Sequence, residues 1–276
     1  MNKPTTLLYL AGSSYSGSTL MDLLLGSHPA VESLGEAKKI RSVQKSMDAG
    51  AEAKCNCGAP VAECAFWRTV LEPRREFEEG DPAANADLFN RALAFRGRSV
   101  ILDNSKNVGR ALMLHRSRMF DMHVLHVVRD SRAVVFSHRR KSERRTKDNS
   151  FRLFPTARQW NRLNLRIARS FRGKNGVSYL LVRYEDLVAD PEKEIRRILG
   201  QLSLPWNPQV LHFRESCHHG IEGNRMRLGN SQKIERDDEY ISALSWTQWW
   251  TITALTLRGL CSFGYKLGRP RRTNSS

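Results

Sequence analysis

Long apolar runs are missing from this 276-residue sequence. No window approaches the ~20 apolar residues that a membrane-spanning helix needs. The best candidate, WWTITALTLRGLCSF at 249–263, contains Arg258 and several threonines. We therefore predict a helix packed on the protein surface at this place, and no membrane span.

A secretory leader is also missing from the start of the sequence. MNKPTTLLYLAG holds one lysine and a short apolar run, and a glycine-rich loop follows at once. Cleavage there would remove that loop, so we interpret residues 6–11 as a core strand. A cytoplasmic location is the resulting expectation.

Cysteine is scarce, with five in the chain, but three of the five lie close together. Cys55, Cys57 and Cys64 fall within CNCGAPVAEC, whereas a structural zinc site usually has four ligands. Three candidates for a fourth ligand could reach the cluster only through the fold: His115, His126 and Cys217. We favour a small loop with reduced thiols and no metal, with a metal site as the alternative. A disulfide would require export.

Acidic residues are few beside the basic ones: 28 Asp and Glu face 45 Lys and Arg, which gives a net charge of +17. Such an excess is typical of proteins that bind an anionic ligand, a nucleic acid or an anionic membrane surface. No recognised nucleic-acid-binding module is present, so a nucleic-acid-binding protein is only an alternative. The basic run HRRKSERRTKDN at 138–149 is interpreted as a mobile solvated loop, or else as a dock for an acidic acceptor.

Four short apolar segments alternate with helical patterns: TLLYLA (6–11), SVILD (99–103), HVLHVV (123–128) and VSYLLVR (177–183). Such segments are typical of strands that helices cover on both faces. Helices are predicted at 18–27, 156–172 and 191–202. The order predicts an α/β fold with a central parallel sheet flanked by helices. We expect a single domain over residues 1–268 and a flexible basic tail over 269–276.

GSSYSGST at 12–19 has the outline of a phosphate-binding loop but lacks its lysine. Gly12 and Gly17 have the Walker A spacing, yet Ser18 stands where the lysine belongs. Backbone N–H groups at a helix N-terminus bind an anion whatever the side chains. Hydroxyl groups of the loop add donors: Ser14, Ser16, Ser18 and Thr19. Without its lysine the loop is poorly suited to a nucleoside triphosphate with magnesium, and it predicts a less charged ligand.

A second anion-binding pattern occurs in LHVVRDSRAVVFSHRR at 125–140. Arg129 follows a buried-looking strand, and ligands of parallel sheets lie beyond the carboxyl ends of the strands. A guanidinium there suits a phosphate group, and Ser137 on the following helix could add a hydroxyl. The alternative is that Arg129 and Asp130 only cap the start of that helix.

These segments belong to an ordered set that covers nearly the whole chain: SYSGSTLMDLLLGSHP (14–29), LGE (34–36), DNSK (103–106), VVRDSRAVVFS (127–137) and RYEDLVADPEKEIRRIL (183–199). The set resembles sulfotransferases that use 3′-phosphoadenosine 5′-phosphosulfate (PAPS), and most of all tyrosylprotein sulfotransferases and related bacterial enzymes. LPWNPQVLHF at 204–213 is similar to the former. The resemblance implies a P-loop-like sulfotransferase fold, PAPS as co-substrate and adenosine 3′,5′-bisphosphate as product. It implies a hydroxyl acceptor on a tyrosyl peptide, a carbohydrate or a small molecule.

The resemblance also implies a nucleotide site. The residues that would hold the 5′-phosphosulfate are Ser16, Gly17, Ser18 and Thr19. The 3′-phosphate would be held by Arg129 and Ser137, and Tyr184 would contact the nucleotide. A late loop, GNRMR, would close over it with Asn224, Arg225 and Arg227.

Two further residues acquire catalytic roles from the resemblance. Glu36 matches the base of tyrosylprotein sulfotransferases, and a carboxylate can accept the proton that an attacking hydroxyl loses. Lys106 matches a lysine that stabilises charge on the sulfuryl group and the leaving phosphate. No metal is required, because these donors replace magnesium.

Position 15 departs from the family pattern. The family usually has Lys or Arg just before the Ser-Gly of the loop, and that residue assists the transfer, but here it is Tyr15. Tyrosine donates a hydrogen bond without carrying a charge at neutral pH. Lys106 alone then carries the electrophilic role, or Tyr15 donates a weaker bond, or the enzyme is slow, altered or inactive. We favour the first interpretation.

The main alternative function is a P-loop kinase-like phosphotransferase. Asp103, at the end of SVILD, would be its Walker B aspartate, and Ser18 argues against it. The sequence does not decide the acceptor, and it leaves a homodimer open.

Overall fold

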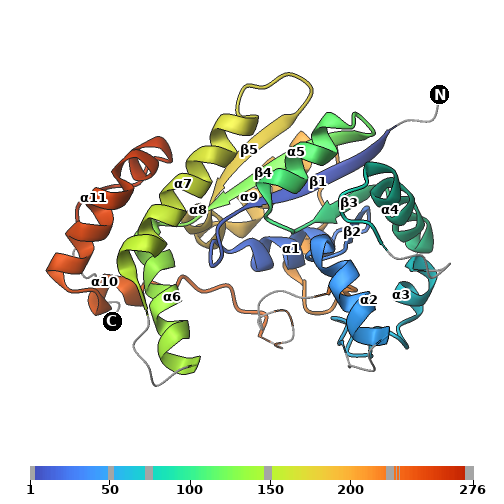
Figure 1. The fold of residues 1–276 in the computed structure, drawn as a ribbon, viewed down its shortest axis with the longest axis horizontal. Helices are drawn as coiled ribbons and strands as arrows, with labels where there is room; N and C mark the ends of the chain where they lie inside the picture. Colours follow the sequence, from blue (N-terminus) through green and yellow to red (C-terminus); the bar gives the residue numbers. More distant parts are fainter. Residues whose placement is uncertain are drawn as a thin grey trace.

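The computed structural model describes residues 4–48, 53–71, 77–145, 151–221, 227, 229 and 231–270. Within them, a sheet of five parallel strands has the order β2-β3-β1-β4-β5 (Figure 1). The strands are β1 (Thr5–Gly12), β2 (Val31–Ser33), β3 (Val100–Asp103), β4 (Phe120–Val128) and β5 (Ser178–Arg183). The four predicted strands and the α/β fold are confirmed. The edge strand β2 was not predicted, because a three-residue segment with Glu32 at its centre has no apolar run.

Helices fill the connections between the strands. They are α1 (Ser18–Gly26), α2 (Ile40–Asp48), α3 (Ala65–Val70), α4 (Pro82–Arg96), α5 (Val108–Arg116), α6 (Ser131–Arg145), α7 (Leu153–Phe171), α8 (Tyr184–Ala189), α9 (Pro191–Gln201), α10 (Glu239–Ala243) and α11 (Trp246–Ser262), with short 3-10 helices η1 (Ala37–Lys39) and η2 (Pro208–Leu211). The three predicted helices correspond to α1, α7 and α9. In α9, Pro191 occupies the first turn and the Asp190 carboxylate accepts from the Lys193 N–H at 3.1 Å, which explains why this helix starts there.

Alternate residues of β1 face two separate hydrophobic cores. Leu7 and Tyr9 pack in a core that includes buried residues of α4, α5 and α7. Leu8 and Leu10 pack in another, which includes buried residues of α1, α8 and α9. Successive side chains of a strand point to opposite faces, so a nearly continuous apolar strand requires cover on both sides. This is the layered arrangement that the apolar runs predicted.

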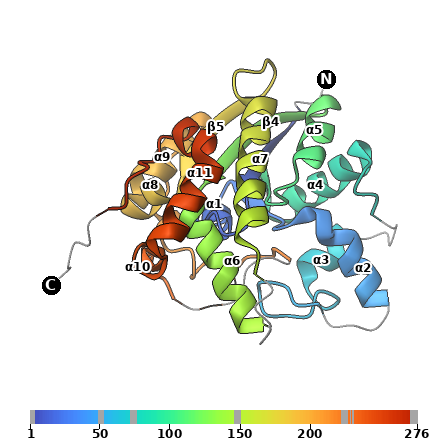
Figure 2. The same cartoon turned by 60° about the vertical axis from the view of Figure 1, so that its left-hand side comes forward.

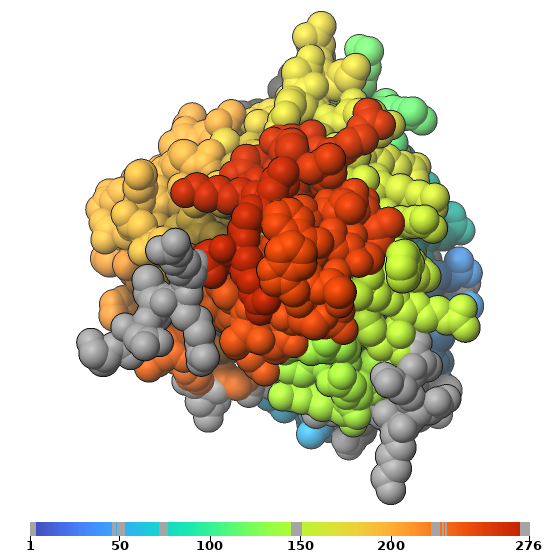
Figure 3. Space-filling model, turned by 90° about the vertical axis from the view of Figure 1, so that its left-hand side faces the viewer, coloured from blue at the N-terminus to red at the C-terminus, as the bar shows by residue number. Residues whose placement is uncertain are grey.

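The C-terminal helix α11 forms an outer layer against α6 and α7 (Figure 2). It begins with a capping box, in which the Ser245 hydroxyl accepts from the Gln248 N–H and the Gln248 side chain accepts from the Ser245 N–H. Trp249 is a buried residue of α11 itself, and Figure 3 shows how this C-terminal segment covers one face of the molecule. The predicted surface-packed helix is confirmed. Among the residues that the structure describes, no helix is both long enough and apolar enough to cross a bilayer.

Two basic segments were predicted to lack regular structure: a loop at 138–149 and a tail at 269–276. Residues 138–145 are the last turns of α6 and not a loop, because the helix that starts at Ser131 continues through the basic run; residues 146–149 lie outside the described part. The predicted tail begins at Arg269, whose guanidinium donates to the Leu244 carbonyl at 2.8 Å. Residues 271–276 are not described, so the boundary at 268 stays a prediction.

The strand order places five loops at one edge of the sheet. Because all strands are parallel, the segments that follow β1, β2, β3, β4 and β5 all leave from the carboxyl edge. Those segments carry most of the residues singled out in the sequence: 13–17, 34–36, 104–106, 129–130 and Tyr184.

Candidate active site

The loop between β1 and α1 requires glycine at both ends. A Cβ on Gly12 would lie 2.4 Å from the carbonyl oxygen of Val127 on the neighbouring strand β4. Gly17 has φ +91° and forms the N-cap of α1, and a Cβ there would lie 2.4 Å from Cδ2 of Tyr184. The backbone can therefore approach its neighbours closely at both positions, and the loop ends at the N-terminus of a nine-residue helix.

Hydroxyl groups of this loop are buried without protein partners. In the described part of the chain, neither the Ser13 nor the Ser16 side-chain oxygen has a hydrogen-bond partner. Ser18 is buried, Thr19 is half-buried and Ser14 is exposed. Buried polar groups are normally paired, so orphaned hydroxyls beside free helix N–H groups indicate an anion as the missing partner. The loop fits the phosphosulfate group that the resemblance implies.

Arg129 and Tyr184 meet beside this loop. The Arg129 guanidinium lies 4.5 Å from the centre of the Tyr184 ring, and the same ring lies against Gly17. Arg129 also donates to the backbone carbonyl of Asp237 at 2.9 Å and contacts its carboxylate at 3.3 Å. Ser137 is buried two turns into α6. Gly17, Arg129 and Tyr184 thus converge from three strand ends. Asp237 is a competitor for Arg129 that sequence reasoning missed.

Asp130 caps the start of α6, as the alternative interpretation had it, because its carboxylate accepts from the Arg132 N–H at 2.8 Å. The same carboxylate also accepts from the Arg132 guanidinium at 2.6 Å, so the cap involves Arg132 and not Arg129. Arg132 is a buried structural partner, and it leaves Arg129 directed toward Tyr184. Arg140, from the same helix, also contacts the Asp237 carboxylate, at 3.2 Å. The sequence identified Arg140 only as part of the basic run at 138–149 and did not reveal its contact with Asp237.

Glu36 and Lys106 form an ion pair across the carboxyl ends of β2 and β3. The Lys106 ammonium lies 2.9 Å from one Glu36 oxygen, and the Lys38 ammonium lies 3.6 Å from the other. Burial disfavours the charged carboxylate, but the two ammonium groups outweigh it and hold the pKa of Glu36 below its usual range. Lys106 has φ +56°, a backbone conformation that few non-glycine residues adopt. The two predicted catalytic residues therefore lie in direct contact.

Asp22 and Asn104 are polar residues of this site that sequence reasoning missed. Asp22 is buried on α1 and accepts from the Ser33 hydroxyl at 2.6 Å. Burial raises the pKa of Asp22 to about 6, although Ser33, Lys106 and Asn104 lower it. Asn104 donates to the Ser18 carbonyl at 3.4 Å, and its own side-chain oxygen has no partner in the described part. The signal for Asp22 was a lone acid within the apolar run STLMDLLLG.

Asp103, the Walker B candidate, is already fully bonded. One carboxylate oxygen lies 2.9 Å from Arg110 Nε, and the other accepts from the N–H of Ser105 at 2.9 Å and from its hydroxyl. Its side chain is completely buried. A magnesium-binding aspartate must keep oxygens free for the metal and its waters, so this arrangement argues against the kinase alternative.

Position 15 has basic neighbours from α6. The Tyr15 ring meets the His138 ring edge-on with centroids 4.6 Å apart, and the Lys141 ammonium lies 5.8 Å from the ring centre. Tyr15 has φ +63°, so the loop holds this side chain in a strained backbone conformation. The catalytic role of Tyr15 stays a prediction.

The late loop is only partly described. Asn224 and Arg225 lie outside the described residues, whereas Arg227 donates to the side chain of Asn56, next to the cysteine cluster. The role predicted for these three residues in closing over the nucleotide stays a prediction.

The chain is similar to known proteins in sequence. A family model described as "Sulfotransferase family" matches residues 8–208. Protein-tyrosine sulfotransferase A of Caenorhabditis elegans is 24% identical over 243 residues, 87% of this chain and 59% of its own length. Protein-tyrosine sulfotransferase 1 of Danio rerio is 28% identical over 78% of this chain and 58% of its own length. The chain thus spans little more than half the length of these curated relatives.

Solved structures show the same fold. The sulfotransferase domain from the curacin biosynthetic pathway has a TM-score of 0.52 at 16% identity, covering 97% of this chain and all of its own. Sulfotransferase STF9 from Mycobacterium avium also has a TM-score of 0.52, at 15% identity, covering 98% of this chain and 79% of its own. The chain belongs to the sulfotransferase family, a family of group-transfer enzymes. The predicted likeness to tyrosylprotein sulfotransferases is confirmed by the curated relatives.

Proposed function

We propose that this chain transfers a sulfuryl group from PAPS to an acceptor hydroxyl. The observation that carries the proposal is the 2.9 Å pair of Glu36 and Lys106 at the sheet edge that also holds the phosphate loop. Transfer needs a base where the acceptor loses its proton and a cation where negative charge grows on the leaving oxygen. A carboxylate and an ammonium side by side meet both needs.

The nucleotide-holding residues have separate tasks in this proposal. The N–H groups at the start of α1 and the Ser16 hydroxyl bind the 5′-phosphosulfate. No side chain caps that helix start, and the Ser16 hydroxyl has no protein partner among the described residues. Arg129 and Ser137 bind the 3′-phosphate, and the Arg129 contact with Asp237 opens as the phosphate enters. Tyr184 packs beside the nucleotide. PAPS supplies the activated sulfuryl group.

The proposed reaction moves one proton to Glu36, forms one bond to sulfur and breaks another. Glu36 accepts the hydroxyl proton while the acceptor oxygen forms a bond to sulfur. The bond from sulfur to the phosphate oxygen breaks, and Lys106 donates a hydrogen bond to that oxygen as adenosine 3′,5′-bisphosphate leaves. Lys106 cannot serve Glu36 and the leaving oxygen equally. When it turns to the leaving oxygen, the partly buried Glu36 loses a counter-charge and becomes a stronger base.

We propose a tyrosyl peptide as the acceptor class. The support is the names of the curated relatives, which are protein-tyrosine sulfotransferases. The basic residues at the end of α6 suit an acidic peptide by charge. A cytoplasmic location and a homodimer stay predictions of the sequence.

The test is transfer of labelled sulfuryl group from PAPS to a tyrosyl peptide, a phenol and a sugar. We expect label on the peptide, and a loss of about 10²–10⁴-fold in kcat with Glu36→Gln, which keeps the shape of the side chain. Titration calorimetry should detect adenosine 3′,5′-bisphosphate binding without magnesium in both proteins. Magnesium-dependent ATP binding in its place would contradict the proposal.

A further inference from the structure

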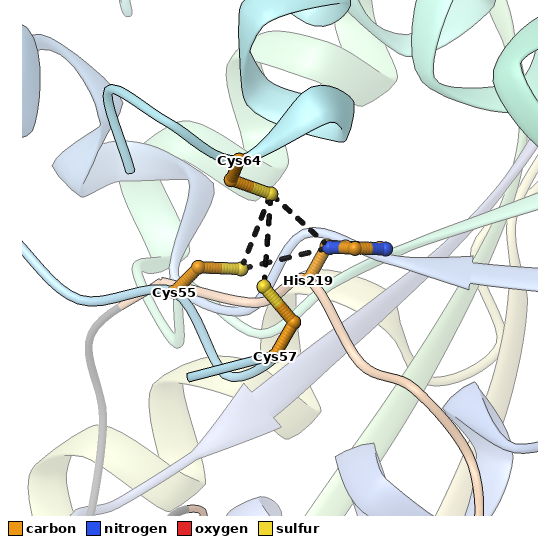
Figure 4. Close-up of side chains that lie close together, drawn as sticks. All are labelled: Cys55, Cys57, Cys64 and His219. Carbon is orange, nitrogen blue, oxygen red and sulfur yellow. Dashed lines mark hydrogen bonds between the residues drawn. The ribbon is translucent and has the colours of Figure 1, made fainter. Parts of the chain in front are cut away.

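Four potential metal ligands converge, three from one short loop and one from a segment far along the chain. Cys55, Cys57 and Cys64 lie on the loop before α3, and His219 lies on the segment after η2 (Figure 4). Their ligand atoms all lie within 4.8 Å of one another. We infer that these four side chains form a structural Cys3His zinc site. His219 is the fourth ligand that the sequence did not reveal.

Four distances between the ligand atoms match the edges of a zinc tetrahedron. Zn–S bonds of ~2.3 Å and Zn–N bonds of ~2.0–2.1 Å at tetrahedral angles give S–S edges of about 3.8 Å and S–N edges of about 3.5 Å. The Cys64 sulfur lies 3.8 Å from those of Cys55 and Cys57. Nδ1 of His219 lies 3.4 Å from the Cys64 sulfur and 3.6 Å from the Cys55 sulfur. A disulfide would instead bring two sulfurs to about 2.05 Å.

The imidazole is held with Nδ1 toward the sulfurs. The ring of Phe66 stacks on the His219 ring with centroids 4.7 Å apart and planes 8° apart. The Trp67 indole N–H donates to the His219 carbonyl at 2.7 Å. Both aromatic residues come from α3, directly after Cys64. The helix that follows the cysteine loop therefore fixes the orientation of the distant ligand, as the neighbours of metal-binding histidines do.

Backbone amides of the loop point at the sulfurs. The backbone N–H groups of Cys57, Ala59 and Trp67 lie beside the sulfurs of Cys55, Cys57 and Cys64, respectively, where they can donate to thiolates. Three thiolates at these distances would repel one another strongly unless a cation lay between them. Zinc meets this need and uses thiolates as its ligands.

The other side of the imidazole carries a compensating group. Nε2 of His219 lies 3.7 Å from the Cys217 sulfur and 2.6 Å from the Arg96 guanidinium. A guanidinium only donates, so here Nε2 accepts from Arg96. A metal at Nδ1 would put the imidazole proton on Nε2; Arg96 would then have to give up this hydrogen bond, and the Cys217 sulfur could accept from the Nε2–H. Three thiolates exceed the charge of one dication by one, and the Arg96 charge balances that excess.

The site joins the cysteine loop to the strand end that carries Glu36. The Asn56 N–H donates to the Gly220 carbonyl at 3.2 Å, and the Glu36 N–H donates to the Ile221 carbonyl at 3.3 Å. A Cβ on Gly35 would lie 2.7 Å from that same carbonyl oxygen, so the two segments touch closely. Zinc would therefore fix the backbone on which Glu36 sits. This positioning role rests on the proposed function, whereas the metal site does not.

The test is the metal content of the full chain, purified without chelator and measured by mass spectrometry. We expect about one zinc per chain. Cys64→Ser should lose it, whereas His219→Cys, which keeps four ligands, should retain it. Cys261→Ser is the matched control, since that thiol is exposed on α11, and it should retain full zinc. Circular dichroism and adenosine 3′,5′-bisphosphate binding report whether each variant is folded.

Cobalt provides a second readout that does not depend on activity. The reduced, chelated protein should bind Co²⁺ with thiolate-to-cobalt charge transfer and the strong visible bands of a tetrahedral complex. Absence of both zinc and cobalt binding, stoichiometric iron, a disulfide among the three cysteines, or full zinc in Cys64→Ser would overturn the site. If zinc is present and its removal leaves kcat unchanged, the positioning role is overturned while the site stands.

Discussion

Asp22→Asn should make the protein more stable at neutral pH. The buried Asp22 carboxyl has its pKa raised from 3.8 to about 6, chiefly by burial. Each pKa unit corresponds to ~1.36 kcal/mol, so ionised Asp22 destabilises the folded state by about 3 kcal/mol above pH 6. Asparagine has the same shape and can still accept from Ser33, whose hydroxyl lies 2.6 Å away. The substitution removes the charge and keeps the hydrogen bond.

The sign of the pH dependence follows from the direction of the shift. An acid whose pKa is higher in the folded state binds its proton more tightly there, so the destabilisation is absent below about pH 4 and complete above about pH 6. The stability gain from Asp22→Asn should therefore be about 3 kcal/mol at pH 7.5 and about half of that at pH 5.

Urea unfolding of both proteins at pH 5, 6 and 7.5 measures this difference. Asp87→Asn is the matched control, because Asp87 is exposed and its contact with Arg91 is an ordinary helix pair. That control should change stability by less than about 1 kcal/mol at every pH. A gain that does not vary with pH, or a loss at pH 7.5, would refute the reasoning that burial of this charge is unfavourable.

Three further outcomes follow from the site. Lys106→Ala should lower kcat by about 10²–10³-fold while bisphosphate binding persists, and Tyr15→Phe should change kcat little. A larger loss of kcat in Tyr15→Phe than in Lys106→Ala would show that the tyrosine has the electrophilic role. Lys38→Met removes one of the charges that lower the pKa of Glu36, so the pKa of Glu36 should rise. The acidic limb of the pH profile of kcat/KM should then move to higher pH, and an unmoved limb would contradict the assignment of Glu36 as the base. Asp237→Ala removes a carboxylate that an entering phosphate must displace from Arg129. Calorimetry should therefore show bisphosphate binding that is up to about tenfold tighter, ~1.4 kcal/mol. Weaker binding would show that this carboxylate helps to hold the nucleotide.

The fold was predictable where the sequence had long periodic or apolar segments. β1, β3, β4 and β5 are apolar runs in a sheet that helices cover on both faces, and α7 and α9 carry one clear apolar stripe each. β2 escaped prediction because its pairing with β3, and not its own three residues, makes it a strand. The helical conformation of the basic segment 138–145 was not predicted, because this segment has no apolar pattern of its own. The first turns of α6 pack in a hydrophobic cluster, and the helix continues from them through the basic residues.

The site was predictable to the extent that its residues follow strands. Glu36, Lys106 and Arg129 each stand just beyond a strand end, and a parallel sheet brings such positions to one edge. Asp237 and His219 come from irregular segments after the last strand. Their approach depends on how those segments cross the sheet edge, and no local pattern encodes it.

The missing lysine of the phosphate loop is best understood through the distribution of cations around it. A triphosphate loop concentrates charge in its own lysine and in magnesium, whereas here Ser18 is neutral and buried at the helix start. The cations come from other elements: Lys106 after β3, Arg129 after β4 and Lys141 from α6 beside Tyr15. Two of them already contact a carboxylate, Glu36 or Asp237. A cation that must leave a carboxylate to meet its ligand binds the ground state weakly, and the carboxylate that it leaves gains basicity. In this site Lys106 would move from Glu36 to the leaving oxygen as that oxygen becomes charged, and Glu36 would become a stronger base at the same moment. A lysine within the loop would not contact Glu36 and could not couple these two events.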